Sequence, residues 1–470
     1  MVEMPVRFAR GLTSRARRTF LVASLLSLLA IAGGYGWDGL ALHAQTPRTR
    51  HVVLISIDGL KPSTYTKPGP LKIPTLRRLA REGAWADGVI GVMPTVTYPS
   101  HTTMITGVPP AVHGIPNNLI LDPEGAANGE WYRFAADIRV PTLPGVVKAA
   151  GLTTAAVSWP VSAGMDVDFL LPEFGYYRHP KMLALMRLIS EPRHLIDAYE
   201  HATGSPLPWP MTDDDRTGLA AWILRTYRPH LLLLHIFGTD DAQHSHGPDS
   251  PEAHAAIERA DGHVAQVLDA VRAAGLADRT DIVIVSDHGF LRYDRVLKPN
   301  ALFRQEGLIR VNDAGRVTSW DAWYDTAGGS GFVVLKDGAD DALRSRVGAL
   351  LRTLAADPAN GVDTVLDRAA LDARGAHPRA AFALTMREGF SSSGGHDVLL
   401  DRTPTRGTHG FDPEHPELHA SLIMHGPDVP ASGSLGVVRM TQIAPTIARW
   451  FNVALSPDVD EPLPVAAGVR

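Results

Sequence analysis

The stretch HVVLISIDG, residues 51–59, is a run of β-branched and leucine residues that ends in an aspartate and a glycine. A nearly continuous apolar run of this length is typical of a strand buried on both faces of a parallel sheet. Two further runs have the same form, LLLLHIFG at residues 231–238 and DIVIVSDHG at residues 281–289. Open α/β sheets bind ligands where such strands end, so the three runs predict a site at that edge.

Strand-like and helix-like segments alternate from residue 51 onward. Strands are expected at residues 52–57, 84–90, 153–158, 230–236, 281–286 and 419–424. Helices are expected at residues 74–82, 100–106, 142–150, 214–227, 252–274 and 439–451, and several of them are followed by glycine. The alternation predicts an α/β fold with a doubly wound, mostly parallel sheet and helices on both faces.

The composition is that of a globular protein without cysteine chemistry. The chain has 470 residues, 45% hydrophobic and 20% charged, which is long enough for one large domain with insertions or for two domains. Its formal net charge of −5 gives no electrostatic support for a stable nucleic-acid partner. Because cysteine is absent, the chain forms no disulfides, and any metal must be held by oxygen and nitrogen ligands.

Residues 1–45 are expected to be an export leader. An uncharged apolar stretch at residues 20–32 is too short for a membrane span, and it follows five arginines: Arg7, Arg10, Arg15, Arg17 and Arg18. The sequence around Arg17 and Arg18 resembles a twin-arginine signal. We expect a periplasmic or extracellular protein, with the leader either cleaved or retained as its one membrane anchor. A buried N-terminal helix is the alternative.

Residues 46–470 are expected to form one large domain with two additions. Residues 163–213 are rich in proline, tyrosine, histidine and leucine and show no strand-like run, which predicts a lid over the edge of the sheet. Residues 291–395 contain a strand-like GFVVLK and a helix-like DDALRSRVGALLRTLA. We expect them to form an inserted cap subdomain.

Candidate metal ligands follow the buried strands and recur in the later segment GTHGFD, residues 407–412. They are three aspartates and three histidines, a donor set that suits a pair of zinc-like ions: Asp58, Asp240, His244, Asp287, His288 and His409. Asp240 and His244 are four residues apart and would share one face of a helical turn. Asp287 and His288 can bind together only if their strand has ended, which Gly289 permits.

Each of these motifs taken alone has a structural explanation. Asp58 also suits a helix cap, Asp287 an Asx turn, and Asp240 with His244 a helix start followed by a surface histidine. His235 and His246 are candidates for side chains that support the ligands.

A nucleophile is suggested by MPTVTYPSHTTMITG, residues 93–107. Thr97 lies between two prolines and precedes a helix-like segment whose N-terminal amides would face an anion. A threonine hydroxyl attacks poorly unless a metal lowers its pKa, so this role requires the neighbouring ions. Otherwise Thr97 is a turn residue. Asn118, in HGIPNN, could donate a hydrogen bond to a phosphoryl oxygen.

In their order along the chain these motifs resemble the nucleotide pyrophosphatase/phosphodiesterase family of the alkaline phosphatase superfamily, over residues 51 to about 451. The resemblance implies an alkaline-phosphatase-like fold and hydrolysis of phosphodiester or pyrophosphate bonds in nucleotide-type small molecules through a phosphothreonyl intermediate on Thr97. It also implies that Asn118 binds phosphoryl oxygens. Two Zn²⁺ ions are implied, one held by Asp58, Asp287, His288 and the Thr97 oxygen, the other by Asp240, His244 and His409.

The chain departs from the usual family pattern beside the nucleophile. Tyr98 and Ser100 stand where family members commonly have phenylalanine and asparagine. Tyr98 could still stack on a nucleobase or an aromatic leaving group. The alternatives are a hydrolase of phosphomonoesters, phosphonates or phospholipid head groups on the same scaffold, and a secreted binding protein without catalysis. A sulfatase is disfavoured, because the chain lacks a Cys/Ser-x-Pro-x-Arg motif. The oligomeric state is not predicted.

Overall fold

The computed structural model describes residues 50–127, 129–174, 179, 181–429 and 433–465. The predicted leader, residues 1–45, lies outside these described residues. Within the described part of the chain, no helix has both the length and the apolar character that crossing a membrane requires.

The core of the fold is an eight-stranded sheet in the order β18-β2-β17-β7-β1-β6-β4-β5. Its strands are β1 (His51–Ile57), β2 (Ala84–Trp85), β4 (Thr154–Val157), β5 (Phe169–Leu171), β6 (Leu231–Ile236), β7 (Thr280–Val285), β17 (Leu422–His425) and β18 (Gly433–Ser434). Strand β1 is parallel to both β6 and β7, and β4 is parallel to β5 and β6. Because β17 alone among the described strands of this sheet runs antiparallel to its neighbours, the predicted mostly parallel α/β fold is confirmed.

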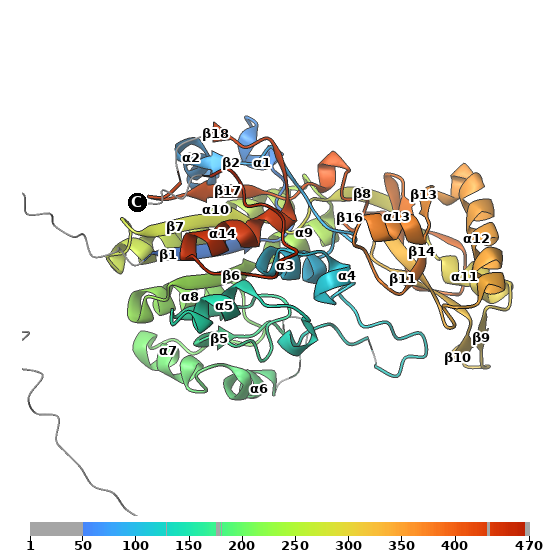
Figure 1. Cartoon of the computed structure of the whole chain (residues 1–470), viewed down its shortest axis with the longest axis horizontal. Helices are drawn as coiled ribbons and strands as arrows, with labels where there is room; N and C mark the ends of the chain where they lie inside the picture. The colour runs from blue at the N-terminus through green and yellow to red at the C-terminus, as the bar shows by residue number, and fades with distance from the viewer. Residues whose placement is uncertain (1–49, 128, 175–178, 180, 430–432, 466–470) are drawn as a thin grey trace, which may run out of the picture. The chain divides into compact units, whose positions relative to one another are not determined.

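Helices cover both faces of this sheet (Figure 1). Alternate residues of β1 point to opposite faces, as the period of a strand requires. Val53 and Ile55 pack in one core with α2 (Pro74–Glu82), α8 (Asp213–Tyr227) and α10 (Pro251–Ala273). Val52 and Leu54 pack in the other with α3 (Thr97–Thr106), α5 (Leu143–Ala149) and α14 (Ile443–Phe451). The doubly wound arrangement therefore follows from the continuous apolar run that opens the domain.

One predicted strand is divided in the structure. Residues 84–90 form β2 and a separate β3 (Gly88–Ile90), which pairs with β19 (Val437–Arg439) in its own two-stranded sheet. The pairing beside β17 explains the interruption, because Trp85 pairs with Ile423 whereas Val89 pairs with Ala420, one residue out of that register. On the other side, residues 433–439 run along both pieces in one register, so the division is a short interruption.

The stretch at residues 163–213 is more regular than the sequence indicated. It contains α6 (Met182–Ile189), α7 (Leu195–Thr203) and β5, which extends the central sheet beside β4. The expectation that this stretch has no strand is therefore wrong, since three residues are enough to pair with an edge. Its action as a lid stays a prediction.

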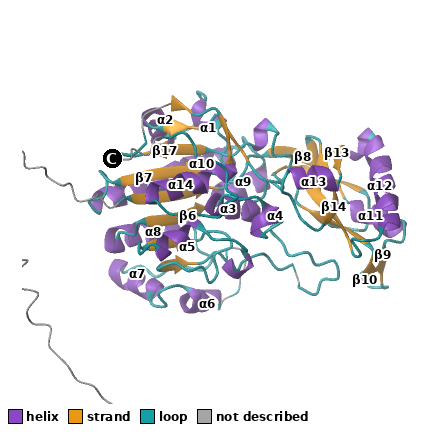
Figure 2. Cartoon of the chain, in the orientation of Figure 1, coloured by secondary structure: helices purple, strands orange, loops and turns teal. Residues whose placement is uncertain are grey.

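Residues 291–395 contain a second sheet of four antiparallel strands, β11 (Ala322–Thr326), β12 (Ser330–Leu335), β14 (Ala380–Met386) and β13 (Val362–Leu366). Figure 2 labels β13 and β14 of this sheet near the helices α12 and α13. Strand β12 contains GFVVL of the strand-like GFVVLK, and α12 (Asp341–Ala356) contains the helix-like segment after its capping residue Asp340. Val333, Leu351 and Leu384 belong to a hydrophobic core of this region's own. Smaller elements here are α11 (Pro299–Gln305), β9 (Ile309–Val311), β10 (Val317–Trp320) and α13 (Arg368–Ala373).

A three-stranded sheet joins the two ends of this region. Strand β8 (Leu291–Leu297) lies between β15 (Gly389–Ser392) and β16 (Leu400–Thr408). Thr408 of β16 pairs with Leu291 of β8, so the chain returns beside the point from which it left. His409 therefore lies close to the end of β7.

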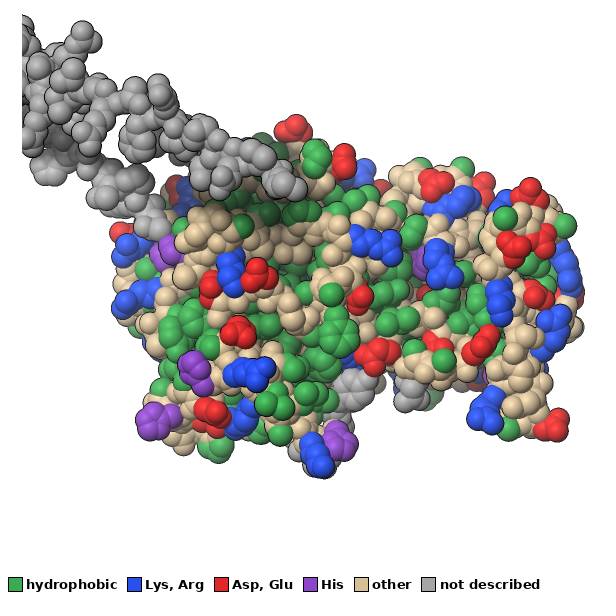
Figure 3. Space-filling model, turned by 60° about the horizontal axis from the view of Figure 1, so that its bottom comes forward, with side chains coloured by type: hydrophobic (Ala, Val, Ile, Leu, Met, Phe, Trp, Pro, Cys, Tyr) green, Lys and Arg blue, Asp and Glu red, His purple; other side chains and the backbone are tan. Residues whose placement is uncertain are grey.

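Charged side chains of both signs are interspersed over the molecular face in Figure 3. No extended field of lysine and arginine covers that face. This mixture of signs agrees with the small formal net charge of −5.

Candidate functional site

Strand ends bring the predicted ligands together. Asp58 directly follows β1, and β7 ends at Val285, before Asp287 and His288. The prediction that this strand ends before its two ligand residues is confirmed. After β6 the chain enters α9 (Gly238–His246), where Asp240 and His244 lie one turn apart.

The first group of candidate ligands is Asp58, Asp287 and His288. All three are at most 2% exposed, and each offers a ligand atom within 4.8 Å of the others. His288 Nε2 lies 3.1 Å from Asp287 Oδ2 and 3.5 Å from Asp58 Oδ1. These side chains face one another at the carboxyl ends of two adjacent central strands.

The second group is Asp240, His244 and His409, which also fall within 4.8 Å of one another. His244 Nε2 lies 3.3 Å from Asp240 Oδ1 and 3.1 Å from His409 Nε2. On the far side of each ring, Nδ1 of His244 lies 3.0 Å from the Gly407 carbonyl and Nδ1 of His409 lies 3.1 Å from the Thr95 carbonyl. A neutral imidazole that donates from Nδ1 presents a lone pair on Nε2, which is the form that binds a metal.

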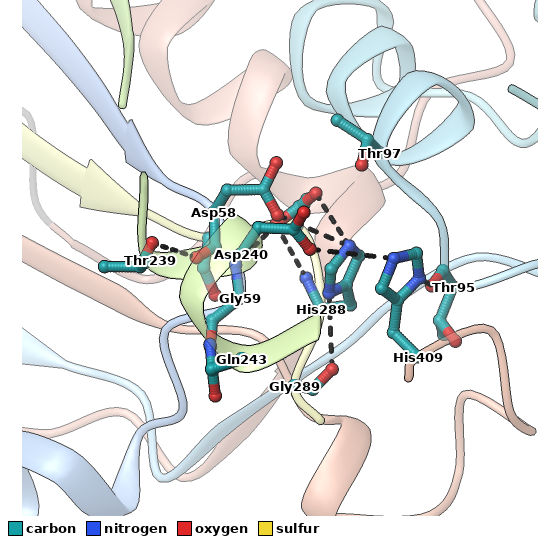
Figure 4. A network of polar contacts seen from close by, with 12 residues as sticks. Asp58, Gly59, Thr95, Thr97, Thr239, Asp240, Gln243, His288, Gly289 and His409 are labelled. Atoms are coloured by element: carbon teal, nitrogen blue, oxygen red, sulfur yellow. Dashed lines mark hydrogen bonds and ion pairs between the residues drawn. The ribbon is translucent and has the colours of Figure 1, made fainter. Parts of the chain in front are cut away.

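The two groups adjoin each other. The rings of His288 and His409 stack with centroids 3.6 Å apart and planes 15° apart (Figure 4). His288 belongs to the first group and His409 to the second, so the structure brings all six predicted ligands into one cluster.

The cluster has the unsatisfied polar atoms that a cation would satisfy. Among the described residues, four buried atoms at its centre make no hydrogen bond: Asp58 Oδ1, Asp240 Oδ1, Asp287 Oδ2 and His288 Nε2. Burying carboxylate oxygens without donors is costly, and bound cations remove that cost. The donor set of carboxylate oxygens and imidazole nitrogens fits zinc and other divalent transition metals.

The protonation of the cluster is correspondingly uneven. Burial, together with the neighbouring carboxylates of Asp287 and Asp240, raises the pKa of Asp58 well above its usual range. Burial alone would also raise the pKa of Asp287, but the ring of His288 lowers it well below its usual range. Burial would lower the pKa of His244, yet Asp240 raises it to about 9. Binding of cations must therefore displace protons from this site.

Thr97 begins a helix at the edge of the cluster. Helix α3 starts at Thr97, three residues earlier than expected, and the residue is partly exposed. In Figure 4 its side-chain oxygen faces the side on which Asp58, His288 and His409 lie. The amides of a first helical turn carry partial positive charge, so an anion placed here would meet both the hydroxyl and the helix end.

Asn118 is tied to the same helix end. Its Oδ1 accepts a hydrogen bond of 2.8 Å from the Tyr98 amide. The Asn118 Nδ2 group makes no hydrogen bond to any residue that the structure describes, and the side chain is partly exposed. The amide is therefore oriented with its donor group available beside Thr97.

Tyr98 does not have the exposed ring that stacking on a substrate needs. The residue is 1% exposed, its ring packs with Ile115 and Val161, and its hydroxyl donates to Glu173. The structure thus corrects the expected substrate contact, because the neighbours of α3 enclose this side chain.

Two buried histidines support the cluster from behind. Both His235 and His246 were candidates for supporting the ligands. His235 Nε2 lies 3.0 Å from Asp58 Oδ2, whereas His246 is exposed on α9. Sequence reasoning missed His101, whose Nδ1 lies 2.8 Å from the Thr97 carbonyl and whose Nε2 lies 2.9 Å from Ser56 Oγ. Burial and the nearby His235 lower the pKa of His101 to about 3, so it is neutral. Its spacing of four residues from Thr97 was the available signal.

Comparisons with known proteins agree with this geometry. The model of the family described as type I phosphodiesterase / nucleotide pyrophosphatase matches residues 52–412. Human ectonucleotide pyrophosphatase/phosphodiesterase family member 1 is 28% identical over 257 residues, which cover 52% of this chain and 24% of that protein. The bis(5'-adenosyl)-triphosphatase enpp4 of Xenopus laevis is 23% identical, over 63% of this chain and 58% of that protein. The chain thus spans between a quarter and about three fifths of these relatives.

Solved structures share the fold. Murine ectonucleotide pyrophosphatase/phosphodiesterase 5, as an inactive variant in complex with AMP, superimposes with a TM-score of 0.62 at 18% identity. The match covers 87% of this chain and 96% of the murine chain. The human counterpart gives a TM-score of 0.61 at 20% identity.

Proposed function

This chain belongs to the type I phosphodiesterase / nucleotide pyrophosphatase family, and from that membership we propose that it hydrolyses phosphodiester or pyrophosphate bonds in nucleotide-type small molecules. The observation that carries the proposal is the cluster of six oxygen and nitrogen ligands beside a partly exposed threonine at a helix N-terminus. One of the named relatives is a bis(5'-adenosyl)-triphosphatase, which supports a nucleotide-type substrate.

We propose that the site holds two zinc ions. Asp58, Asp287 and His288 with the Thr97 oxygen would hold one ion, and the second group, Asp240, His244 and His409, would hold the other. Bound cations would supply neutralisation of the phosphoryl oxygens and a lowered pKa for the Thr97 hydroxyl. The orphaned buried atoms of both groups support this assignment.

Thr97 is the proposed nucleophile. Its oxygen attacks phosphorus in line with the leaving oxygen, so that a Thr97 O–P bond forms as the P–O bond to the leaving group breaks and the leaving group takes up a proton. Water then attacks the phosphothreonyl group, which releases the phosphorylated product and restores the hydroxyl. Asn118 Nδ2 donates to a phosphoryl oxygen, and the amides at the start of α3 favour the growing negative charge.

The remaining parts of the chain have proposed roles around this site. Residues 1–45 would export the protein, residues 163–213 would act as a lid, and residues 291–395 would form the cap of the catalytic domain at residues 46–470. Fractionation of cells that express the full chain tests the first proposal, since the product should appear outside the cytoplasm.

Metal analysis and a substrate panel test the function. Purified protein should contain about two zinc ions per chain and hydrolyse bis(p-nitrophenyl) phosphate, with a dinucleoside polyphosphate preferred to a simple monoester or a phosphocholine lipid. Thr97→Ala should lower kcat by at least 10³-fold. Thr106→Ala is the matched control, because that hydroxyl lies at the other end of α3 and bonds to the Thr102 carbonyl. Full activity in Thr97→Ala, or protein without metal, would contradict the proposal.

A further inference from the structure

Asn117 joins the neighbourhood of the nucleophile to the insertion. The residue is 3% exposed and lies just before Asn118. Its Nδ2 donates to Asp325 Oδ2 at 2.9 Å and to the Thr326 carbonyl at 3.0 Å. Both acceptors end strand β11, more than two hundred residues away along the chain. The two hydrogens of one buried amide are therefore committed to the inserted region.

The opposite side of the same amide holds Asn118. Asn117 Oδ1 accepts a hydrogen bond of 2.9 Å from the Asn118 backbone amide. Asn118 Oδ1 in turn accepts from the Tyr98 amide, in the first turn of α3. A continuous chain of hydrogen bonds thus runs from β11 through both asparagines to the residue after Thr97.

The turn between β11 and β12 also contacts the backbone of the second ligand group at His409. The Gly329 amide donates to the His409 carbonyl at 2.7 Å. A Cβ added at Gly410 would lie 1.6 Å from the Ala327 carbonyl oxygen, and one added at Gly328 would lie 2.7 Å from the His409 oxygen. The backbones are therefore in contact, and the turn borders both Asn117 and His409.

The geometry points to Asn117 as a positioning residue: through its bonds to Asp325 and Thr326, the β11–β12 turn holds Asn118 in the orientation that presents Nδ2 beside Thr97. This inference rests on the proposed function, because it assigns Asn118 to the phosphoryl oxygens. It gives the insertion a part in catalysis that does not require it to touch the substrate.

The strength of the link comes from burial and charge. Burial raises the pKa of Asp325 to about 6, and the Asn117 donor opposes that rise. A hydrogen bond to an ionised carboxylate is stronger than one between neutral groups. A displacement of the Asn118 side chain by about 1 Å would lower kcat by up to about 10²-fold, since a misplaced donor loses its contact with the phosphoryl oxygen in the transition state.

Exchanging the side chains of Asn117 and Asp325 tests the hydrogen bond between them. Asn117→Asp keeps an oxygen for the Asn118 amide but places a carboxylate against Asp325, so kcat should fall about 10- to 100-fold with KM changed less than about twofold. Combining Asn117→Asp with Asp325→Asn restores one donor and one acceptor and should recover at least tenfold of the loss. No recovery in the double variant would overturn the proposal.

A double-mutant cycle separates positioning from general support. Asn117→Ala should lower kcat in the wild-type background but by less than about twofold in an Asn118→Ala background, because no donor remains to be positioned. An equal loss in both backgrounds would overturn the inference. Asn300→Ala is the matched control, since Asn300 is a buried asparagine that bonds to the neighbouring Tyr324 of β11, and its folded variant should keep the wild-type kcat.

A crystal structure of Asn117→Ala gives a readout independent of activity. The distance between Asn118 Oδ1 and the Tyr98 amide, 2.8 Å in the wild type, should lengthen beyond hydrogen-bonding range. An unchanged distance overturns the inference even if the wild type hydrolyses no substrate, whereas an inactive wild type with a lengthened distance overturns only the proposed function. Asp325→Ala provides a second variant should Asn117→Ala fail to fold.

Discussion

The two groups of candidate ligands differ in what holds them. Asp58, Asp287 and His288 follow adjacent central strands and are almost completely buried. In the second group, Asp240 and His244 lie on α9 and His409 follows β16, and the His244 side chain is 40% exposed. The first group is set by the register of a parallel sheet, whereas the second forms only if the insertion folds and returns the chain. The comparison predicts that the first group is a closed and rigid half of the site. It predicts that the second group is an open half, from which a ligand can be lost and replaced.

The largest effect is expected in the closed half. Asp287→Asn keeps an Oδ1 acceptor for the Gly59 and His288 amides, which now donate at 3.1 Å each, and removes only the ligand charge. Activity should fall by about 10⁴-fold and about one zinc ion per chain should be lost, as measured by kinetics and elemental analysis. A variant that keeps both zinc ions and a tenth of the activity would show that Asp287 is no ligand.

A smaller and reversible loss is expected in the open half. His244→Ala should lower kcat about 10²-fold, and added imidazole or excess zinc should restore part of it, because the exposed position admits a small replacement ligand. His246→Ala is the control on the same helix, since His246 is exposed, and it should leave activity unchanged. Failure of imidazole and zinc to restore any activity would contradict the predicted openness.

The histidine behind Asp58 sharpens the contrast further. His235→Gln removes the ring that lies 3.0 Å from Asp58 Oδ2, whereas the rings of the second group are backed by carbonyl groups. Zinc affinity of the first group should fall about 10-fold while the second group keeps its affinity. Chelator titration monitored by zinc release measures both, and equal weakening of the two would refute a separate role for His235.

The smallest effect concerns the amino end of β7. Burial raises the pKa of Asp281 to about 7, in contrast to Asp287 at the other end, where His288 lowers it. The folded state therefore binds more protons than the unfolded state, whose aspartates have a pKa of about 3.9, and stability falls as pH rises from about 4 to about 7.

Asp281→Asn removes this titration and keeps the acceptor for the Asp428 amide. The difference in melting temperature, variant minus wild type, should increase by a few degrees from pH 5 to pH 8. A difference that stays constant over this range would exclude the raised pKa.

Much of the central sheet was readable from the sequence, because buried parallel strands are continuous apolar runs and their ends carry the polar residues. The division of residues 84–90, by contrast, depends on how they pair with residues 420–425 and 433–439, which lie more than three hundred residues away. The burial of Tyr98 likewise depends on Glu173 and Val161, and the sequence around Tyr98 does not predict these neighbours. The sequence did not predict roles for His101 and Asn117 for the same reason, because their hydrogen-bond partners, Ser56 and Asp325, lie far away along the chain.

The sequence by itself determined the fold class and identified the six candidate ligands and the candidate nucleophile, because buried parallel strands are continuous apolar runs and most of the candidate ligands follow such runs closely. Only the tertiary structure decided that His409 joins Asp240 and His244, that Tyr98 is enclosed, and that Asn117 links Asn118 to β11. These features require contacts between segments far apart in the chain, and such contacts are selected by packing of the whole domain rather than by local propensity.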